Sequence, residues 1–305
     1  MPAARFRSAS AALYDRLYSE RSQIRLEHWI MNVSILGFLV HLVVIFLART
    51  LAHPPALIAL AGTNYLSAIY TPFSFILFYE VLMLIAALPQ STTRSIAKQY
   101  EIVSLIFIRR FFKDIATLED IGKLVQFTSD LLPLFIDVLA GMFMFLLVTV
   151  FLGAAKSRID TTPAADETSA VKRFISRKKA IAVILTILLV SLAARSVLEF
   201  SHALLVGEQA DPNRFFYSEV FTIMIFTDVL IAILSLAVSD RYELVFRNAA
   251  FVISTILIRF SLTVSNPFFA AELAVAAMLF GIATLLIYNY HLQIRVPDRT
   301  PLRQT

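Results

Sequence analysis

The stretches FYEVL at residues 78–82 and SLIFIR at residues 104–109 each have a counterpart later in the chain, FTDVL at residues 226–230 and STILIR at residues 254–259. Each copy places one carboxylate in the first stretch and one arginine at the end of the second. An ionisable side chain inside an apolar segment is costly, so one that recurs at a matching place needs a physical reason. The duplication therefore predicts a protein built from two related halves.

Four polar residues occur in the same order in both halves: a histidine, an acid, an arginine and a second acid. The first set is His53, Glu80, Arg109 and Asp137, and the second set is His202, Asp228, Arg259 and Glu272. Counterparts are 148–150 residues apart from the histidines to the arginines, but only 135 apart at the last acid. This drop predicts a longer loop in the first half, which we assign to residues 114–130.

The composition is that of a membrane protein. Apolar residues make up 58% of the chain, the mean hydropathy is +0.75, and several stretches reach the roughly 20 residues that span a bilayer. In such a protein the net charge of +5 is expected to set the topology rather than to bind nucleic acid. The absence of cysteine excludes disulfides, thiolate metal sites and cysteine nucleophiles. We therefore predict an all-α, polytopic membrane protein whose first partner is the lipid bilayer.

Eight membrane helices are predicted, four in each half. They are expected at about 30–48, 68–89, 98–113, 131–155, 179–200, 216–239, 246–265 and 267–290. Of the Lys and Arg residues at the ends of these helices, between them or beyond them, 19 fall on one side and four on the other, which places both termini in the cytoplasm. Four is an even number, so the two halves should enter the membrane in the same orientation.

The predicted organisation has five parts. They are a cytoplasmic tail (1–28), a first membrane repeat (29–155), a basic cytoplasmic linker (156–178), a second membrane repeat (179–290) and a second cytoplasmic tail (291–305). For the first tail, whose apolar residues are interspersed with arginines, the sequence leaves two alternatives open. It is either a short interfacial helix or a partly disordered segment.

The depth of each charged residue predicts which side chains meet. Arg109 and Asp137 lie at a similar distance from the outer ends of their helices, and Glu80 lies one or two turns deeper. The guanidinium group offers five donors in a fork that suits carboxylates. We therefore predict a buried charge network of Glu80, Arg109 and Asp137 in the first half. The corresponding network in the second half joins Asp228, Arg259 and Glu272.

Three roles for these networks are weighed. The first is structural, because partners are needed simply to tolerate a charge in the membrane. The second is a proton or ion pathway along the duplicated acids, and the third is ligand recognition. A free phosphate site is disfavoured, because acids compete for each arginine.

Catalytic and metal chemistry find little support in the sequence. His53 and His202 are expected at outer helix ends, where a histidine is more often an interfacial cap than a ligand. No ligand pair has the close spacing of a zinc motif, so no metal is predicted. Neither a nucleotide-binding loop nor a nucleophile elbow occurs, so we predict no cofactor and no enzymatic activity.

The residues described above also carry a resemblance. The second half resembles the phosphate-starvation-inducible PsiE family of small four-helix bacterial inner-membrane proteins. The matching features are His202, Phe226 to Leu230, Arg247 twelve residues before Arg259, and Pro267 with Glu272. The first half has the same order with His53, Glu80, Arg109 and Pro133 to Asp137, so the chain looks like a tandem fusion of two such units. The resemblance implies a location in the bacterial plasma membrane and expression under stress. It implies no known biochemical activity.

Two functions follow as hypotheses. The first is a non-enzymatic, stress-inducible inner-membrane protein with a packing role, for which a homo-oligomer or a membrane partner remains open. The second is a channel or transporter that moves protons or ions along the acids between the halves. They differ in whether Glu80 and Asp228 face water: a closed ion pair favours the first, and a hydrated cavity with an unpaired acid favours the second.

Overall fold

The computed structural model of the chain describes residues 2–51, 53, 55, 58, 62–117, 128–156, 169–206, 212–236 and 242–295, and all regular structure in these residues is helical. The α-helices are α1 (Pro2–Leu17), α2 (Glu20–Thr50), α4 (Tyr70–Ala87), α5 (Thr92–Thr117), α6 (Thr128–Lys156), α7 (Ser169–Val206), α8 (Pro212–Leu236), α9 (Tyr242–Thr263) and α10 (Pro267–Arg295). A short 3-10 helix, η1 (Tyr65–Ile69), leads into α4. The prediction of an all-α protein is confirmed for the described residues.

Six of these helices are long and apolar enough to cross a membrane. Their spans are Glu20–Thr50, Tyr65–Ala87, Leu132–Lys156, Lys172–Glu199, Tyr242–Thr263 and Pro267–Ile294. Helix α5 is not among them, because it carries seven charged side chains. The protein therefore has the character of a helical membrane protein.

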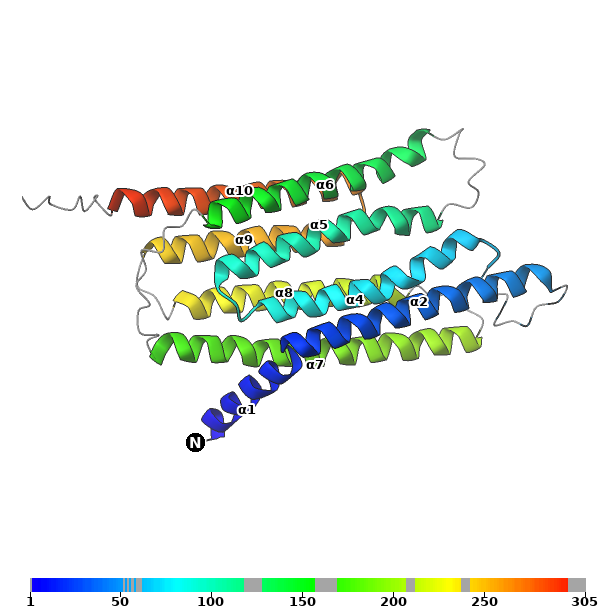
Figure 1. Ribbon diagram of the computed structural model, residues 1–305, viewed down its shortest axis with the longest axis horizontal. Helices are drawn as coiled ribbons and strands as arrows, with labels where there is room; N and C mark the ends of the chain where they lie inside the picture. Colours follow the sequence, from blue (N-terminus) through cyan, green and yellow to red (C-terminus); the bar gives the residue numbers. More distant parts are fainter. Residues whose placement is uncertain are drawn as a thin grey trace, which may run out of the picture.

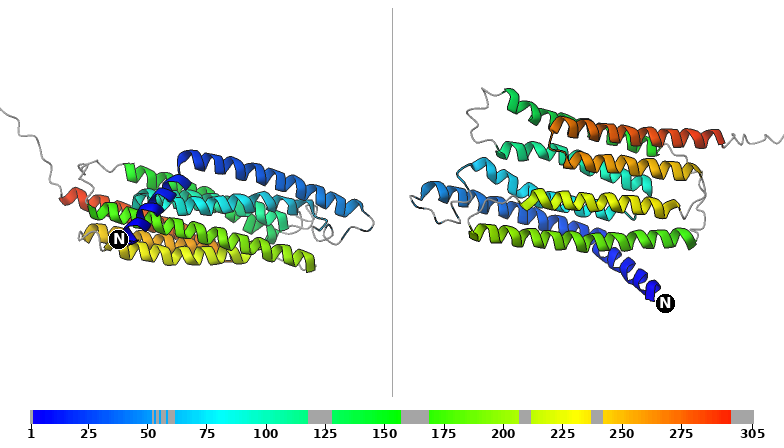
Figure 2. Two further views of the ribbon diagram at one scale, coloured as in Figure 1. Left: turned by 90° about the horizontal axis from the view of Figure 1, so that it is seen from below. Right: turned by 180° about the vertical axis from the view of Figure 1, so that it is seen from behind.

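The long helices form two stacked rows. Helices α2, α4, α5 and α6 contact one another in chain order, and α7, α8, α9 and α10 do the same. Figure 1 shows that neighbours within a row run antiparallel, and that α7 to α10 repeat the order and direction of α2 to α6. Across the rows α6 packs on α10 and α5 on α9, and the two layers are seen edge-on in the left view of Figure 2.

The hydrophobic core lies between the rows rather than within each of them. One buried cluster joins α4 and α5 of the first row with α7 and α8 of the second, and includes Leu84, Leu189 and Met224. The other joins α5 and α6 with α9 and α10, and includes Phe107 and Met278. A flat row of antiparallel helices leaves both of its faces open, so each row buries its apolar residues against the other.

A close contact between the rows is made where α5, α9 and α10 meet. The hydroxyl groups of Tyr100 and Ser254 are hydrogen-bonded at 2.6 Å, and Ser254 donates to the carbonyl oxygen of Ala277 at 2.7 Å. Gly281 faces the same point, because a Cβ atom there would collide with the Tyr100 hydroxyl. Glycine at this position therefore makes room for a buried tyrosine from the other row.

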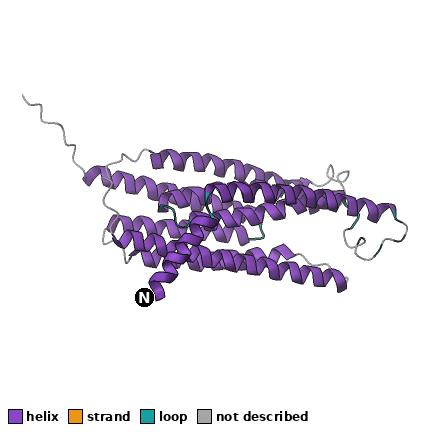
Figure 3. Ribbon diagram, turned by 60° about the horizontal axis from the view of Figure 1, so that its bottom comes forward, coloured by secondary structure: helices purple, strands orange, loops and turns teal. Residues whose placement is uncertain are grey.

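The N-terminal helix α1 turns away from α2 and crosses the start of α7 (Figure 3). The Tyr14 hydroxyl donates to the carbonyl oxygen of Ala86 at 2.5 Å, and Tyr18 shares a hydrogen bond of 2.6 Å with Thr186. Lys179 pairs with Asp15 at 2.6 Å. Burial raises the pKa of both tyrosines, which keeps their hydroxyls protonated. Of the two alternatives left open for the tail, the structure has a helix over Pro2–Leu17.

The structure differs from the predicted boundaries mainly by lengthening the helices. The third predicted helix, 98–113, extends over Thr92–Thr117. Helix α7 begins at Ser169, so the second part of the predicted linker 156–178 is helical, while residues 157–168 lie outside the described residues. Charged residues had suggested a linker there, but Lys178 is buried and Lys179 is paired, which lets the helix continue.

Candidate functional site: two arginine–carboxylate pairs

The first pair joins α4 to α5. Every residue from Glu80 to Leu88 is buried, because the second half of α4 packs against α5, α7 and α8. Within that buried stretch Glu80 is the only residue with an ionisable side chain, and its carboxylate forms an ion pair with the guanidinium of Arg109. The Arg109 side chain is 22% exposed and the Glu80 side chain 5%. The Glu80 side chain is therefore buried, whereas the Arg109 side chain reaches the surface of the protein.

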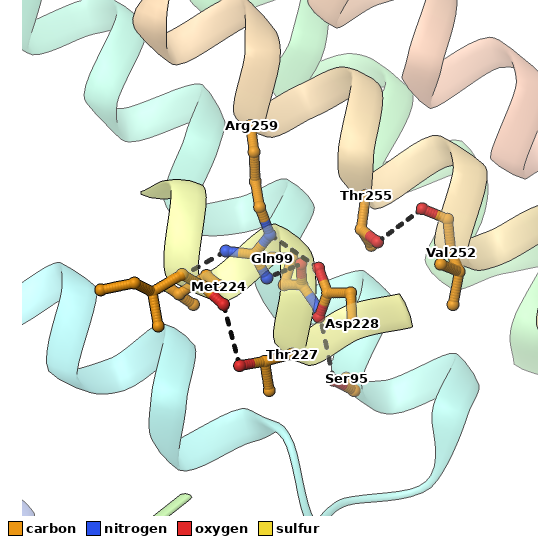
Figure 4. Close-up of polar contacts among 9 residues, drawn as sticks. Ser95, Gln99, Met224, Thr227, Asp228, Val252, Thr255 and Arg259 are labelled. Atoms are coloured by element: carbon orange, nitrogen blue, oxygen red, sulfur yellow. Dashed lines mark hydrogen bonds and ion pairs between the residues drawn. The ribbon is translucent and has the colours of Figure 1, made fainter. Parts of the chain in front are cut away.

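The second pair joins α8 to α9 and is enclosed more completely. Arg259 is 2% exposed, and its Nε donates to Oδ2 of Asp228 at 2.7 Å. Its Nη2 donates to Oε1 of Gln99 at 3.2 Å, and its Nη1 lies 3.2 Å from the sulfur of Met224. Figure 4 shows the guanidinium between these three side chains. Because Gln99 belongs to α5, this pair also ties the second row to the first.

Asp137 is buried, as predicted, but its electrostatic partner is Arg110 rather than Arg109. It is 1% exposed, and its Oδ1 has no hydrogen-bond partner among the described residues. Arg110 lies in the field of both Asp137 and Asp114, and its Nη2 donates to the carbonyl oxygens of Ser261 and Leu262 at 3.1 and 3.2 Å. Arg110 therefore satisfies carbonyl groups in the last turn of α9, where a cation is favoured.

Glu272 does not join the second pair, contrary to the prediction. Its side chain is exposed, whereas α10 buries Ala270, Ala274 and Ala277 on the face that meets α6 and α9. Residues at such spacing form one stripe of a helix, and Glu272 lies outside it. The prediction came from depth in the membrane, which fixes the height of a residue along its helix but not the face.

The two histidines lie apart from the charge pairs. His53 is exposed between α2 and η1, and His202 is exposed near the end of α7. Within the described residues, no group of three His, Asp or Glu side chains is arranged to hold a metal ion. The candidate site therefore consists of the ion pairs Glu80–Arg109 and Asp228–Arg259 together with the groups around them.

Two neighbours of Arg259 were missed because nothing in the local sequence marks them. Gln99 has Ala249 at the matching place in the second half, and Met224 has Ile76 in the first, so neither is part of the repeat. Both reach Arg259 only because the rows stack. The residues beside Gln99 include Lys98 and Glu101, so its local sequence gave no signal of a buried partner.

A cavity lined by eight polar or charged and seven apolar residues, called the polar cavity below, adjoins the second pair. It is lined by side chains of α5, α7, α8 and α9, among them Gln99, Lys178, Asp228 and Asn248, and it encloses about 50 Å³, room for a few water molecules. Asp228 therefore faces its arginine on one side and this cavity on the other. Lys178, which the sequence had placed in the linker, is the second charged group in the lining.

Comparison of the chain with models of protein families, with curated proteins and with solved structures found no match. The fold and the charge pairs thus define the protein's class by themselves. It is an all-α protein with apolar helices of membrane-spanning length, in which two of the buried acids are each paired with an arginine.

Proposed function

We propose that this chain is a bacterial inner-membrane protein of the phosphate-starvation and stress-inducible type, a tandem of two units resembling the PsiE family. Its eight helices span the membrane as two parallel repeats with both termini in the cytoplasm. The protein is not an enzyme. Its duplicated arginine–carboxylate pairs hold the helices in register, and its surface remains open to a homo-oligomer or a membrane partner.

One observation carries the packing role: both duplicated acids are paired with the duplicated arginine of the next helix, Glu80 with Arg109 and Asp228 with Arg259. A guanidinium fixed in this way requires one rotation and one height of each helix relative to its neighbour. Helices of nearly uniform apolar surface have few other ways to define these positions in lipid.

The eight-span topology is supported by the positions of α5 and α8, the two long helices outside the set of six. Helix α5 lies between α4 and α6, and α8 lies between α7 and α9. Both run along the bundle beside apolar helices of membrane-spanning length (Figure 1). The most charged of them, α5, pairs its Arg109 with Glu80, which lowers the cost of placing it in the membrane.

A second candidate function, a proton or ion pathway between the halves, is favoured by a different observation. Asp228 lines the polar cavity between the rows, so one of the duplicated acids is both paired and within reach of water. The second pair is therefore the place where such a pathway would pass.

Flux measurements on the purified full-length protein in lipid vesicles separate the two functions. A pH-sensitive dye inside the vesicles reports protons driven by a potassium diffusion potential. The packing role predicts a rate equal to that of protein-free vesicles. A rate that exceeds this background and is abolished by Asp228→Asn would support the pathway and contradict the purely structural role. Reporter fusions at Met1 and Thr305 test the topology, and an external score at either end would contradict it.

A further inference from the structure

The polar cavity lies between the rows, near the end of α4 and the starts of α5 and α7. Its polar lining includes Thr92 and Ser95 from the first turn of α5, together with Lys178 from α7 and Asn248 from α9. A packing role explains the ion pair beside the cavity but not the cavity itself. The question is which chemistry these side chains would accept.

Lys178 is the central group. Its side chain is buried, its Nζ donates to the carbonyl oxygen of Gln90 at 2.8 Å, and the same atom lies 5.5 Å from the centre of the Phe174 ring. An ammonium group has three donors, and Lys178 uses one of them among the described residues. Two N–H groups of a buried cation are therefore left for the cavity that this side chain lines.

The charges around the cavity sum to one positive charge. Asp228 contributes a carboxylate, but Arg259 already pairs with its Oδ2, and Lys178 adds a second cation. The N-terminus of α5, at Thr92, directs the positive end of its helix dipole to the same space. A buried charge without a counterion is costly, so this excess favours an anion.

The lining holds acceptors as well as donors: the carboxylate of Asp228 accepts, and the hydroxyls of Ser235 and Thr255 already donate to backbone carbonyl oxygens. The donors lie on other residues of the lining. The Oδ1 of Asn248 accepts from Nε and Nη2 of Arg247 at 3.4 and 3.1 Å, which leaves the side-chain NH₂ to donate. The hydroxyl oxygen of Ser95 accepts from Gln99 at 3.5 Å, which leaves its proton to donate. Donors from three helices, α5, α7 and α9, thus line one space with net positive charge.

We propose that this cavity binds a small monovalent inorganic anion, of the size of chloride or bromide, held by Lys178 with Asn248, Thr92 and Ser95. Its volume of about 50 Å³ gives room for a small ion. The carboxylate of Asp228 at the cavity wall disfavours a multiply charged ion. This site goes beyond the packing role, which needs no ligand. Bound there, the anion links α5 of the first row to α7 and α9 of the second.

Thermal unfolding of the purified full-length protein tests the proposal. Sodium chloride, sodium bromide and sodium gluconate are compared at equal ionic strength, with gluconate as the reference because it is a larger, organic anion. A ligand that binds only the folded state stabilises it in a saturable way, so chloride and bromide should raise Tm by roughly 5 °C over gluconate. A Tm that is the same in all three salts would overturn the site.

Two adjacent lysines provide the matched variants. Lys178→Gln should raise the apparent Kd for chloride about tenfold or more, because it removes the cation inside the cavity. Lys179→Gln removes the same charge one residue later, where Nζ pairs with Asp15 at the edge of the chain, and should leave the Kd unchanged. Equal effects of the two variants would show a general response to surface charge and would refute the proposal.

A third variant keeps the test decisive if Lys178→Gln does not fold. Asn248→Asp is nearly isosteric and replaces an amide donor with a carboxylate beside the anion. It should weaken chloride binding about tenfold, measured by the broadening of the chloride-35 NMR signal with increasing protein. Unchanged broadening in this variant would exclude Asn248 from the site and contradict the proposed geometry.

Discussion

The two arginine–carboxylate pairs have the same order and spacing in sequence but different surroundings. Arg259 is 2% exposed and binds Asp228 and Gln99 with Met224 beside it, whereas the Arg109 side chain is 22% exposed and pairs, among the described residues, with Glu80. The cause is the stacking of the rows, which places the second pair between them. A duplicated sequence therefore produced one shared pair and one pair that belongs to its own row.

This difference means that the second pair should matter for joining the rows and the first mainly for joining α4 to α5. The sharpest test compares the same substitution at the two arginines. The contact between Gly281 and Tyr100 tests the row interface without changing any charge, and Glu272 serves as the acid that takes no part.

Arg259→Leu should have the largest effect. Removing one partner of a buried ion pair leaves the other charge stranded, which typically costs about 3–5 kcal/mol. The double variant Arg259→Leu with Asp228→Asn should recover much of that loss, because no buried charge remains unpaired. The measurement is the amount of monodisperse protein in detergent extracts of membranes. A single variant that accumulates normally, with the double variant no better, would remove the packing role from this pair.

Gly281→Ala should be the next most disruptive. The new Cβ would overlap the Tyr100 hydroxyl, and overpacking of this kind costs about 1–3 kcal/mol. Gly153→Ala is the matched control, because a Cβ there meets no atom within 4 Å and alanine favours the helix. A lower Tm is expected for the first variant and an unchanged or higher one for the second. Equal Tm values for the two variants would contradict the tight contact between Gly281 and Tyr100, because they would show that the rows can move apart there.

Arg109→Leu should cost less than Arg259→Leu. It strands the buried Glu80, and leaving a buried acceptor unsatisfied costs about 1–3 kcal/mol. Water or lipid headgroups can approach through the exposed side of the position and relieve part of the penalty. The same accumulation assay ranks the two variants, and a loss at Arg109 equal to that at Arg259 would erase the distinction between the pairs.

Glu272→Gln should have the smallest effect, within about 0.5 kcal/mol, as is usual for an exposed residue without a special contact. Unfolding of the purified variant in the same detergent measures it. A loss comparable to that of Arg259→Leu would restore Glu272 to the network that the sequence predicted.

Sequence reasoning could predict the helices and the two pairs, because hydrophobic length and the placement of acids and arginines act along single helices or between neighbours. It could not decide between Arg109 and Arg110 as the partner of Asp137. Adjacent residues of a helix point about 100° apart, so the choice depends on the rotation of α5. The contacts of Gln99 and Lys178 could not be predicted for another reason. Gln99 binds Arg259 of the opposite row, and Lys178 binds the carbonyl group of Gln90, between α4 and α5.

The docking of α1 on α7 has a consequence for biosynthesis. Tyr18 and Thr186 are 168 positions apart, and Asp15 and Lys179 are 164 apart, so α1 is synthesised well before the surface of α7 that it contacts. At about 5–20 residues per second, α1 waits on the order of ten seconds or more for its site. Tyr14 can meet Ala86 of α4 earlier, whereas Tyr18 and Asp15 find their partners only after the start of α7 has been made. Complete docking of α1 therefore depends on synthesis of the first helix of the second row.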